Sequence, residues 1–159
     1  MTAKGINIAE QCHVVNILPP VDITGGVTGD VFSMDNFAHA TIIVQVGVSA
    51  AAFTKIIVNE CTSLAAADAT AIAHAIYKEE TALGDTLGAR TAVLAAGTTP
   101  SANDNIFYVI ELDASELSDG YGFVQLSLTN GVNSVIASAV AILSGSRYSG
   151  DATGLTAIA

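Results

Sequence analysis

The fold is decided by the stretch Ala38-His39-Ala40-Thr41-Ile42-Ile43-Val44-Gln45-Val46-Gly47-Val48, the longest of several short apolar runs in the chain. Because successive residues of a strand point to opposite faces, its alternating aliphatic side chains would share one face: Ile42, Val44, Val46 and Val48. Similar runs, separated by Gly, Asn, Asp, Ser and Pro, recur around Ile56, Ile76, Val109, Leu126 and Val140. The pattern predicts an all-β protein, a single β-sandwich of the jelly-roll or immunoglobulin-like kind.

About seven to nine strands are expected, with little helix beyond one or two turns. The run over 71–79 is rich in Ala, Lys and Glu, which favour helix, but its alternating apolar residues favour a strand. Residues 113–117 predict a single helical turn, in a passage that joins the two sheets of the sandwich. Asn130-Gly131 is the strongest hairpin signal, and it predicts that 123–129 pairs with 134–143.

Residues 1–37 are predicted to form an extended N-terminal arm, followed by a β-sandwich body over 38–148 and a short C-terminal tail over 149–159. The Pro-Pro pair in the arm favours extended backbone, and the glycine-rich stretch over 24–30 favours a hinge. Such a segment is expected to bury little against its own domain and to dock as a strand on a neighbour. The predicted assembly contacts are Val14, Val15, Ile17, Leu18, Pro19, Pro20, Val21 and Ile23.

The composition indicates a protein that binds other proteins. Hydrophobic residues make up 51% of the chain and charged residues only 13%, against about 25% charged in a typical soluble domain. No apolar run is long enough to span a bilayer. Since the centres of protein–protein interfaces are depleted in charge, we expect an assembly component that forms a homo-oligomer, with a trimer as the expected number of copies.

The net charge of −10 argues against two classes of partner. The five Lys and Arg residues are scattered, so neither a nucleic acid nor an anionic membrane surface would find a basic patch. The first residues lack the continuous apolar core of a secretory signal, which indicates synthesis in a cytoplasm.

The sequence contains no recognisable set of catalytic, cofactor-binding or metal-ligating residues, and we expect that the protein is not an enzyme. The histidines His13, His39 and His74 have no ligand spacing, and the two cysteines, Cys12 and Cys61, are expected to be free, buried or half-buried thiols. Glu111 and Asp113 share a strand face, but a glycosidase pair normally comes from two segments. The Asn and Asp residues over 103–105 and 113–119 supply oxygen atoms that suit calcium, yet these are also the commonest turn formers.

Several segments resemble a family of small proteins from tailed bacteriophages and prophages. They are Gly5-Ile6-Asn7-Ile8-Ala9-Glu10-Gln11, Leu18-Pro19-Pro20-Val21, the stretches 25–30, 38–43, 77–85, 101–106 and 108–111, and Leu143-Ser144-Gly145 with Arg147-Tyr148. The similarity covers most of the chain and brings no catalytic residues with it. It implies a structural virion protein of the phage head.

Within that family we expect a capsid decoration (cement) protein on the outer surface of the head, with the major capsid protein and itself as partners. Such proteins are small β domains whose terminal arms cross subunit boundaries, and their many weak contacts gain strength by repetition over the shell. Two alternatives remain open from the sequence. One is another virion component, in the tail tube, the head–tail joint or a fibre, and the other is a ligand- or sugar-binding β-sandwich module.

Overall fold

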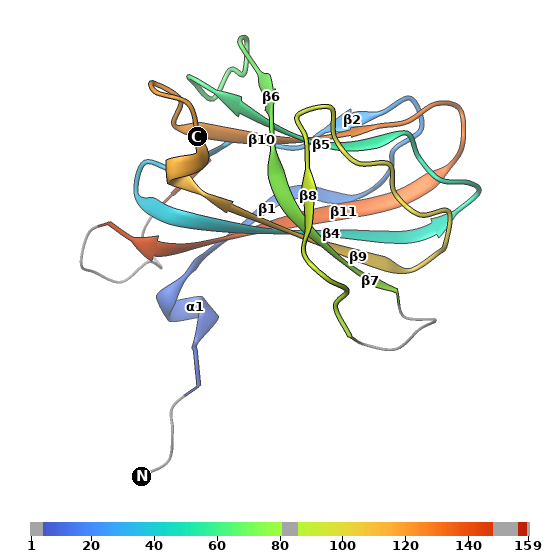
Figure 1. Ribbon diagram of the computed structural model, residues 1–159, viewed down its shortest axis with the longest axis horizontal. Helices are drawn as coiled ribbons and strands as arrows, with labels where there is room; N and C mark the ends of the chain where they lie inside the picture. The colour runs from blue at the N-terminus through green and yellow to red at the C-terminus, as the bar shows by residue number, and fades with distance from the viewer. Residues whose placement is uncertain (1–4, 81–85, 148–155, 159) are drawn as a thin grey trace.

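The computed structural model describes residues 5–80, 86–147 and 156–158, and it is an all-β sandwich of two antiparallel sheets (Figure 1). In spatial order the larger sheet contains β1 (His13–Asp22), β11 (Val135–Ser146), β4 (Phe37–Ser49), β9 (Ile106–Asp113), β7 (His74–Glu80) and β8 (Thr91–Val93). The smaller sheet contains β2 (Val27–Thr28), β10 (Phe123–Thr129), β5 (Lys55–Cys61) and β6 (Thr70–Ile72), and β3 (Phe32–Ser33) also pairs with β10. The predicted fold class is therefore confirmed.

Helix is confined to short segments in the described part of the chain. α1 (Ile8–Gln11) precedes β1, and the 3₁₀ turn η2 (Ala114–Glu116) lies between β9 and β10. The Glu116 carboxylate accepts a hydrogen bond from the backbone N–H of Asp113 at 2.8 Å, which fixes the predicted turn where the chain passes from one sheet to the other. None of the described helices is long and apolar enough to cross a bilayer.

The longest strand, β4, behaves as its alternation predicts over most of its length. Ile42, Val44 and Val46 are buried, whereas the last predicted member of this face, Val48, is 68% exposed near the end of the strand. β4 lies between β11 and β9, so the stretch that decided the fold forms the centre of the larger sheet. The largest fully buried side chains fill the space between the two sheets: Ile17, Ile23, Phe32, Met34, Phe37, Ile42, Phe53, Ile56, Ile106, Ile110, Leu112 and Leu126.

The described residues contain eleven strands, more than the seven to nine expected, because four of them have only two or three residues. The run over 71–79 is extended, as predicted, but it is divided between the sheets. β6 ends at Ile72 in the smaller sheet, and β7 starts at His74 in the larger one. A continuous alternating run therefore crosses from one layer to the other at Ala73.

The predicted hairpin at Asn130-Gly131 is wrong. β10 pairs with strands of the smaller sheet, and β11 pairs with β1 and β4 of the larger one, so this turn is a corner between the layers. The corner is held by the chain after β1. Gly131 accepts a hydrogen bond from the Gly25 N–H at 2.7 Å, and the Asp22 carboxylate accepts one from the Ser134 hydroxyl at 2.6 Å. These bonds join residues that are far apart in the sequence, so local turn propensity cannot predict them. They hold the turn in the conformation that sends β10 and β11 into different sheets.

The prediction that 13–23 buries little against its own domain is also wrong. β1 is the edge strand of the larger sheet, paired with β11, and Val15, Ile17, Leu18 and Ile23 lie in the molecule's own core. The ordered body thus includes most of the predicted arm. The predicted tail over 149–159 lies largely outside the described residues, but Ala157 is buried and its carbonyl accepts a hydrogen bond from the Ser33 N–H at 2.9 Å.

Candidate functional site

The outer face of the larger sheet carries a row of large apolar side chains. Strand register places Val140, Ile43, Val109 and Tyr77 side by side across four strands. Their sequence neighbours on these strands point into the core, so these four point outward, and each is partly exposed. With three further residues of the same face they form what we call the apolar face: Val14, Ile43, Tyr77, Phe107, Val109, Val140 and Ile142.

Nothing in the described chain covers the apolar face. The two sheets make two layers, and α1 projects from the start of β1, so no described helix or third sheet lies over it (Figure 1). Val14 is 51% exposed. An antiparallel sheet with one solvated face normally alternates apolar residues inside with polar residues outside, and here the outer side departs from that pattern.

A histidine held between two carboxylates borders the apolar face. Register sets His39 of β4 opposite Asp113 of β9, and Thr41 opposite Glu111. The His39 Nδ1 lies 2.7 Å from Asp113 Oδ1, and its Nε2 lies 2.6 Å from Glu111 Oε2, which also accepts the Thr41 hydroxyl at 2.7 Å. The sequence showed that Glu111 and Asp113 share a face, but their convergence on His39 requires the β4–β9 register.

The charge state of His39 follows from its neighbours. Burial lowers its pKa, but the hydrogen bonds with Asp113 and Glu111 outweigh that effect, so the pKa is raised above the ordinary value of 6.5. An imidazolium that donates both N–H groups to carboxylates has no free nitrogen with which to accept a proton or bind a metal. The cluster is therefore an ion-paired border of the apolar face.

Of the eight predicted assembly residues, four are accessible and four are not. Val14, Pro19, Pro20 and Val21 are exposed, whereas Val15, Ile17, Leu18 and Ile23 belong to the core. The register of β1 against β11 shifts on both sides of Leu18, which opens a shallow groove of about 250 Å³ on the outer side of the sheet. Pro20 and the exposed Ile136 line this groove, together with Gln45, Gly47, Ala137 and Ser138.

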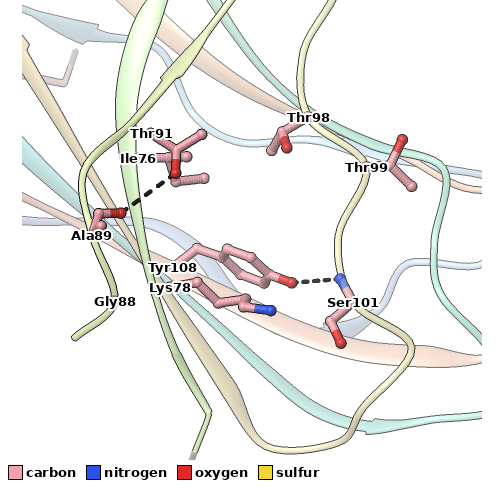
Figure 2. A pocket seen from close by; sticks show the side chains of 9 residues that line it. All are labelled: Ile76, Lys78, Gly88, Ala89, Thr91, Thr98, Thr99, Ser101 and Tyr108. Carbon is pink, nitrogen blue, oxygen red and sulfur yellow. Dashed lines mark hydrogen bonds between the residues drawn. The ribbon is translucent and has the colours of Figure 1, made fainter. Parts of the chain in front are cut away.

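A separate cavity of about 370 Å³ opens beside β7, β8 and β9 (Figure 2). Five of the nine residues that line it carry a hydroxyl group and one carries an ammonium: Ile76, Lys78, Gly88, Ala89, Thr91, Thr98, Thr99, Ser101 and Tyr108. The Tyr108 hydroxyl accepts a hydrogen bond from the Ser101 N–H at 2.7 Å. Tyr108 is 3% exposed, so its ring offers no aromatic platform for a sugar, and none of the described residues that line the cavity is a carboxylate or an imidazole.

The loop beside this cavity is fixed by its backbone. Thr98 exchanges two backbone hydrogen bonds with Ile56, of 2.9 and 3.0 Å. Gly97 precedes it with φ of +77°, and a Cβ there would lie 2.5 Å from the Ile56 carbonyl oxygen. Only glycine fits this turn without displacing β5.

The remaining candidates have structural surroundings. His13 stacks on Phe37 with 5.9 Å between ring centroids. His74 is buried, its Nδ1 lies 3.3 Å from the Ile72 carbonyl oxygen, and burial lowers its pKa. The buried Glu60 carboxylate accepts the Ser118 N–H at 2.7 Å. Two buried polar atoms, His74 Nε2 and Glu79 Oε1, have no hydrogen-bond partner among the residues that the structure describes.

The cysteines and the turn carboxylates are also placed. Cys61 is buried, Cys12 is half-buried, and both are free thiols, as predicted. Burial raises the pKa of the Cys61 thiol, which keeps it protonated at neutral pH. Asp104, in one of the turns considered for calcium, accepts the Ser49 N–H at 2.7 Å. Among the described residues, no group of three or more His, Cys, Asp or Glu side chains is arranged to hold a metal ion.

Comparison with known proteins gives one structural similarity. No protein-family model matches the chain, and no curated protein matches it. Among solved structures, the chain is similar to the crystal structure of SPBc2 prophage-derived protein YomS, with a TM-score of 0.45 and 13% sequence identity. The similarity covers 89% of this chain and 99% of that one.

Proposed function

We propose that this protein is a structural virion protein of a tailed bacteriophage, a capsid decoration protein that stabilises the head by bridging capsid subunits. The observation that carries the proposal is the uncovered apolar face of the larger sheet. Exposed apolar patches of this kind mark sites that bind other proteins. The resemblance of the sequence to small phage proteins supplies the setting.

The chemistry of the side chains supports binding rather than catalysis. Both nitrogens of His39 are engaged by carboxylates, and the His74 ring is buried. Among the described residues, the lining of the cavity beside β7 contains hydroxyl groups and Lys78 but no carboxylate or imidazole. The proposed function therefore requires contact surfaces and no reaction.

A decoration protein acts mechanically. Because it binds the assembled shell and bridges adjacent subunits, its contacts must break before the shell opens, and binding to one state alone stabilises that state by mass action. Many copies around one head add their weak contacts together. The net charge of −10 suits a position on the outside of the shell, away from packaged DNA.

The test is a comparison of phage particles with and without this protein. Particles from a genome lacking its coding sequence are expected to release DNA at a lower temperature, measured by the fluorescence of a DNA-binding dye, and to recover when the purified protein is added. Gel densitometry of wild-type virions is expected to give hundreds of copies, as repetition over a shell requires.

Two results would contradict the proposal. Particles of unchanged heat resistance with unaltered head density by electron microscopy would remove the head role. A low copy number, with density at the tail, joint or fibre, would assign the protein to another part of the virion.

A further inference from the structure

The two outer faces of the sandwich differ in chemistry. Along β5 and β10 of the smaller sheet, five of the eight outward positions are polar: Lys55, Asn59, Gln125, Ser127 and Thr129. The other three are Ile57, Cys61 and Phe123, and they form no apolar row across the sheet. At the centre of the larger sheet, Val140, Ile43, Val109 and Tyr77 form an unbroken apolar row across four strands. The neighbouring rows are mixed, with the apolar Ile142 and Phe107 beside the polar Thr41, Gln45 and Ser138. A monomer has no need for this asymmetry, since a solvated sheet face is normally polar.

Charge is also distributed unevenly. Acidic residues such as Asp30, Asp68 and Asp119 lie in the connections between strands, at the ends of the sandwich. On the outer side of the larger sheet, Glu111 and Asp113 are paired with His39, and the side chain of Glu79 is buried. Two copies, each with a net charge of −10, can therefore approach through the centre of this sheet while their free acids point elsewhere.

The size of the face matches what a stable pair needs. The apolar face occupies three of the four outward rows, and polar side chains such as Gln45 and Ser138 lie at its rim. With five strands about 4.8 Å apart and four rows about 6.8 Å apart, the whole outer face is a patch of about 24 by 27 Å. Its area of about 650 Å² is close to the roughly 800 Å² that each partner buries in a standard protein–protein interface.

From these three observations we infer that the outer face of the larger sheet is the contact surface between two copies of this chain, packed face to face. The partner surface must be apolar, and the described outer face of the smaller sheet is polar, so the same face of a second copy fits best. Sheets stack in this way in β-sandwiches, with about 10 Å between layers. The inference rests on the homo-oligomer expected from the composition and not on attachment to a capsid, for which a pair formed in this way would use other surfaces.

A face-to-face pair has two-fold symmetry, so it predicts an even number of copies. The charge-poor composition alone gave the expectation of a trimer. In a symmetric trimer each contact joins two different surfaces, so the apolar face of one copy would have to pack on another part of the next copy. The mass of the protein in solution separates these arrangements.

The experiment is light scattering of the full-length protein over a micromolar concentration series. Ile43→Glu and Val140→Glu place like charges in the middle of the proposed contact. Ser127→Glu adds the same charge to a half-buried, outward position at the middle of β10 in the other sheet, and serves as the control. The double variant I43T/V140T keeps β-branched residues in both strands while removing apolar surface, and far-ultraviolet circular dichroism checks the fold of each variant.

We expect the wild type and S127E to form dimers of the 16.1 kDa chain or even multiples of them. Both Glu variants and the double Thr variant should shift to the monomer, with self-association weakened at least tenfold. A monomeric wild type, an odd number of copies, or a dimer unaffected by the folded face variants would overturn the inference. None of these outcomes decides the particle experiment, so the capsid role can fail or stand separately.

Discussion

His39 shows how one residue acquires its role from a strand register. Its sequence context indicates only a polar residue in an apolar run, and a hydrogen bond to a neighbour is the expectation. The β4–β9 pairing adds two carboxylates, one on each ring nitrogen, which raise the pKa of His39 and favour its charged form. The imidazolium offsets one of the two carboxylate charges at the border of the apolar face, where an unpaired carboxylate would resist burial.

The pH dependence of the His39 contribution has a definite sign. Because the folded-state pKa is raised above 6.5, the stabilisation is fully present below 6.5 and is lost as pH rises through the folded-state value. His39→Gln should therefore reduce the free energy of unfolding, measured with urea, by about 0.2 to 1 kcal/mol at about pH 6, since the pair is partly exposed. The reduction should be smaller at about pH 9. An equal loss at both pH values would contradict a charged His39.

At the scale of elements, β1 departs most from the sequence-based expectation. Its residues were predicted to leave the domain for a neighbour, because a Pro-Pro pair and a glycine-rich stretch suggested a free arm. The alternation that buries Val15 and Ile17 is short, and the shifts in register around Leu18 break it, so the periodicity that marks a core strand is weak here. The edge position of β1 tolerates both prolines, since an edge strand has one side without a ladder partner.

Two changes to β1 test its place in the core. Ile17 is 1% exposed, so Ile17→Ala should reduce the free energy of unfolding by about 2 to 5 kcal/mol. Val48→Ala, at a 68% exposed position near the end of β4 and outside the apolar face, is the control and should change it by less than about 0.5 kcal/mol. Deleting residues 1–30 should prevent stable folding, and a truncated chain with an unchanged urea midpoint would restore the free-arm interpretation.

The corner between β10 and β11 depends on the Asp22 carboxylate. Hydrogen bonds from the Ser134 side chain and from Thr24 lower the pKa of Asp22 from 3.8 to about 2. Its stabilising contribution is present above 3.8 and is lost as pH falls towards about 2. Asp22→Asn should lower the urea midpoint at neutral pH and flatten the acid dependence below pH 3.8, whereas Asp30→Asn, at an exposed position between β2 and β3, should leave the midpoint at neutral pH unchanged. Equal effects of the two variants would show that the corner does not depend on this carboxylate.

For the whole molecule, the sequence predicts which segments are strands but not which sheet each one joins. The runs containing Ile42, Ile56, Val109 and Leu126 are strands as expected, because alternation is a local property. Sheet membership depends on distant bonds, such as that between Gly25 and Gly131, and on the crossing at Ala73. The apolar face could not be predicted either, since Ile43, Val109 and Val140 become one surface only when β4, β9 and β11 are neighbours.

The salt dependence of self-association follows from the charge of the whole molecule. Each copy carries −10, and the proposed contact contains no ion pair between copies, so the electrostatic term between copies is repulsive. Because the Debye length falls from about 10 Å at 0.1 M salt to about 3 Å at 1 M, added salt screens this repulsion. Sedimentation equilibrium should show tighter association of the wild type as sodium chloride is raised over this range. Ile43→Glu should recover part of its loss at high salt, because its own like-charge repulsion is screened as well, while S127E should follow the wild type. Weaker association at high salt would mean that ion pairs hold the copies together, and that the apolar face is not their contact.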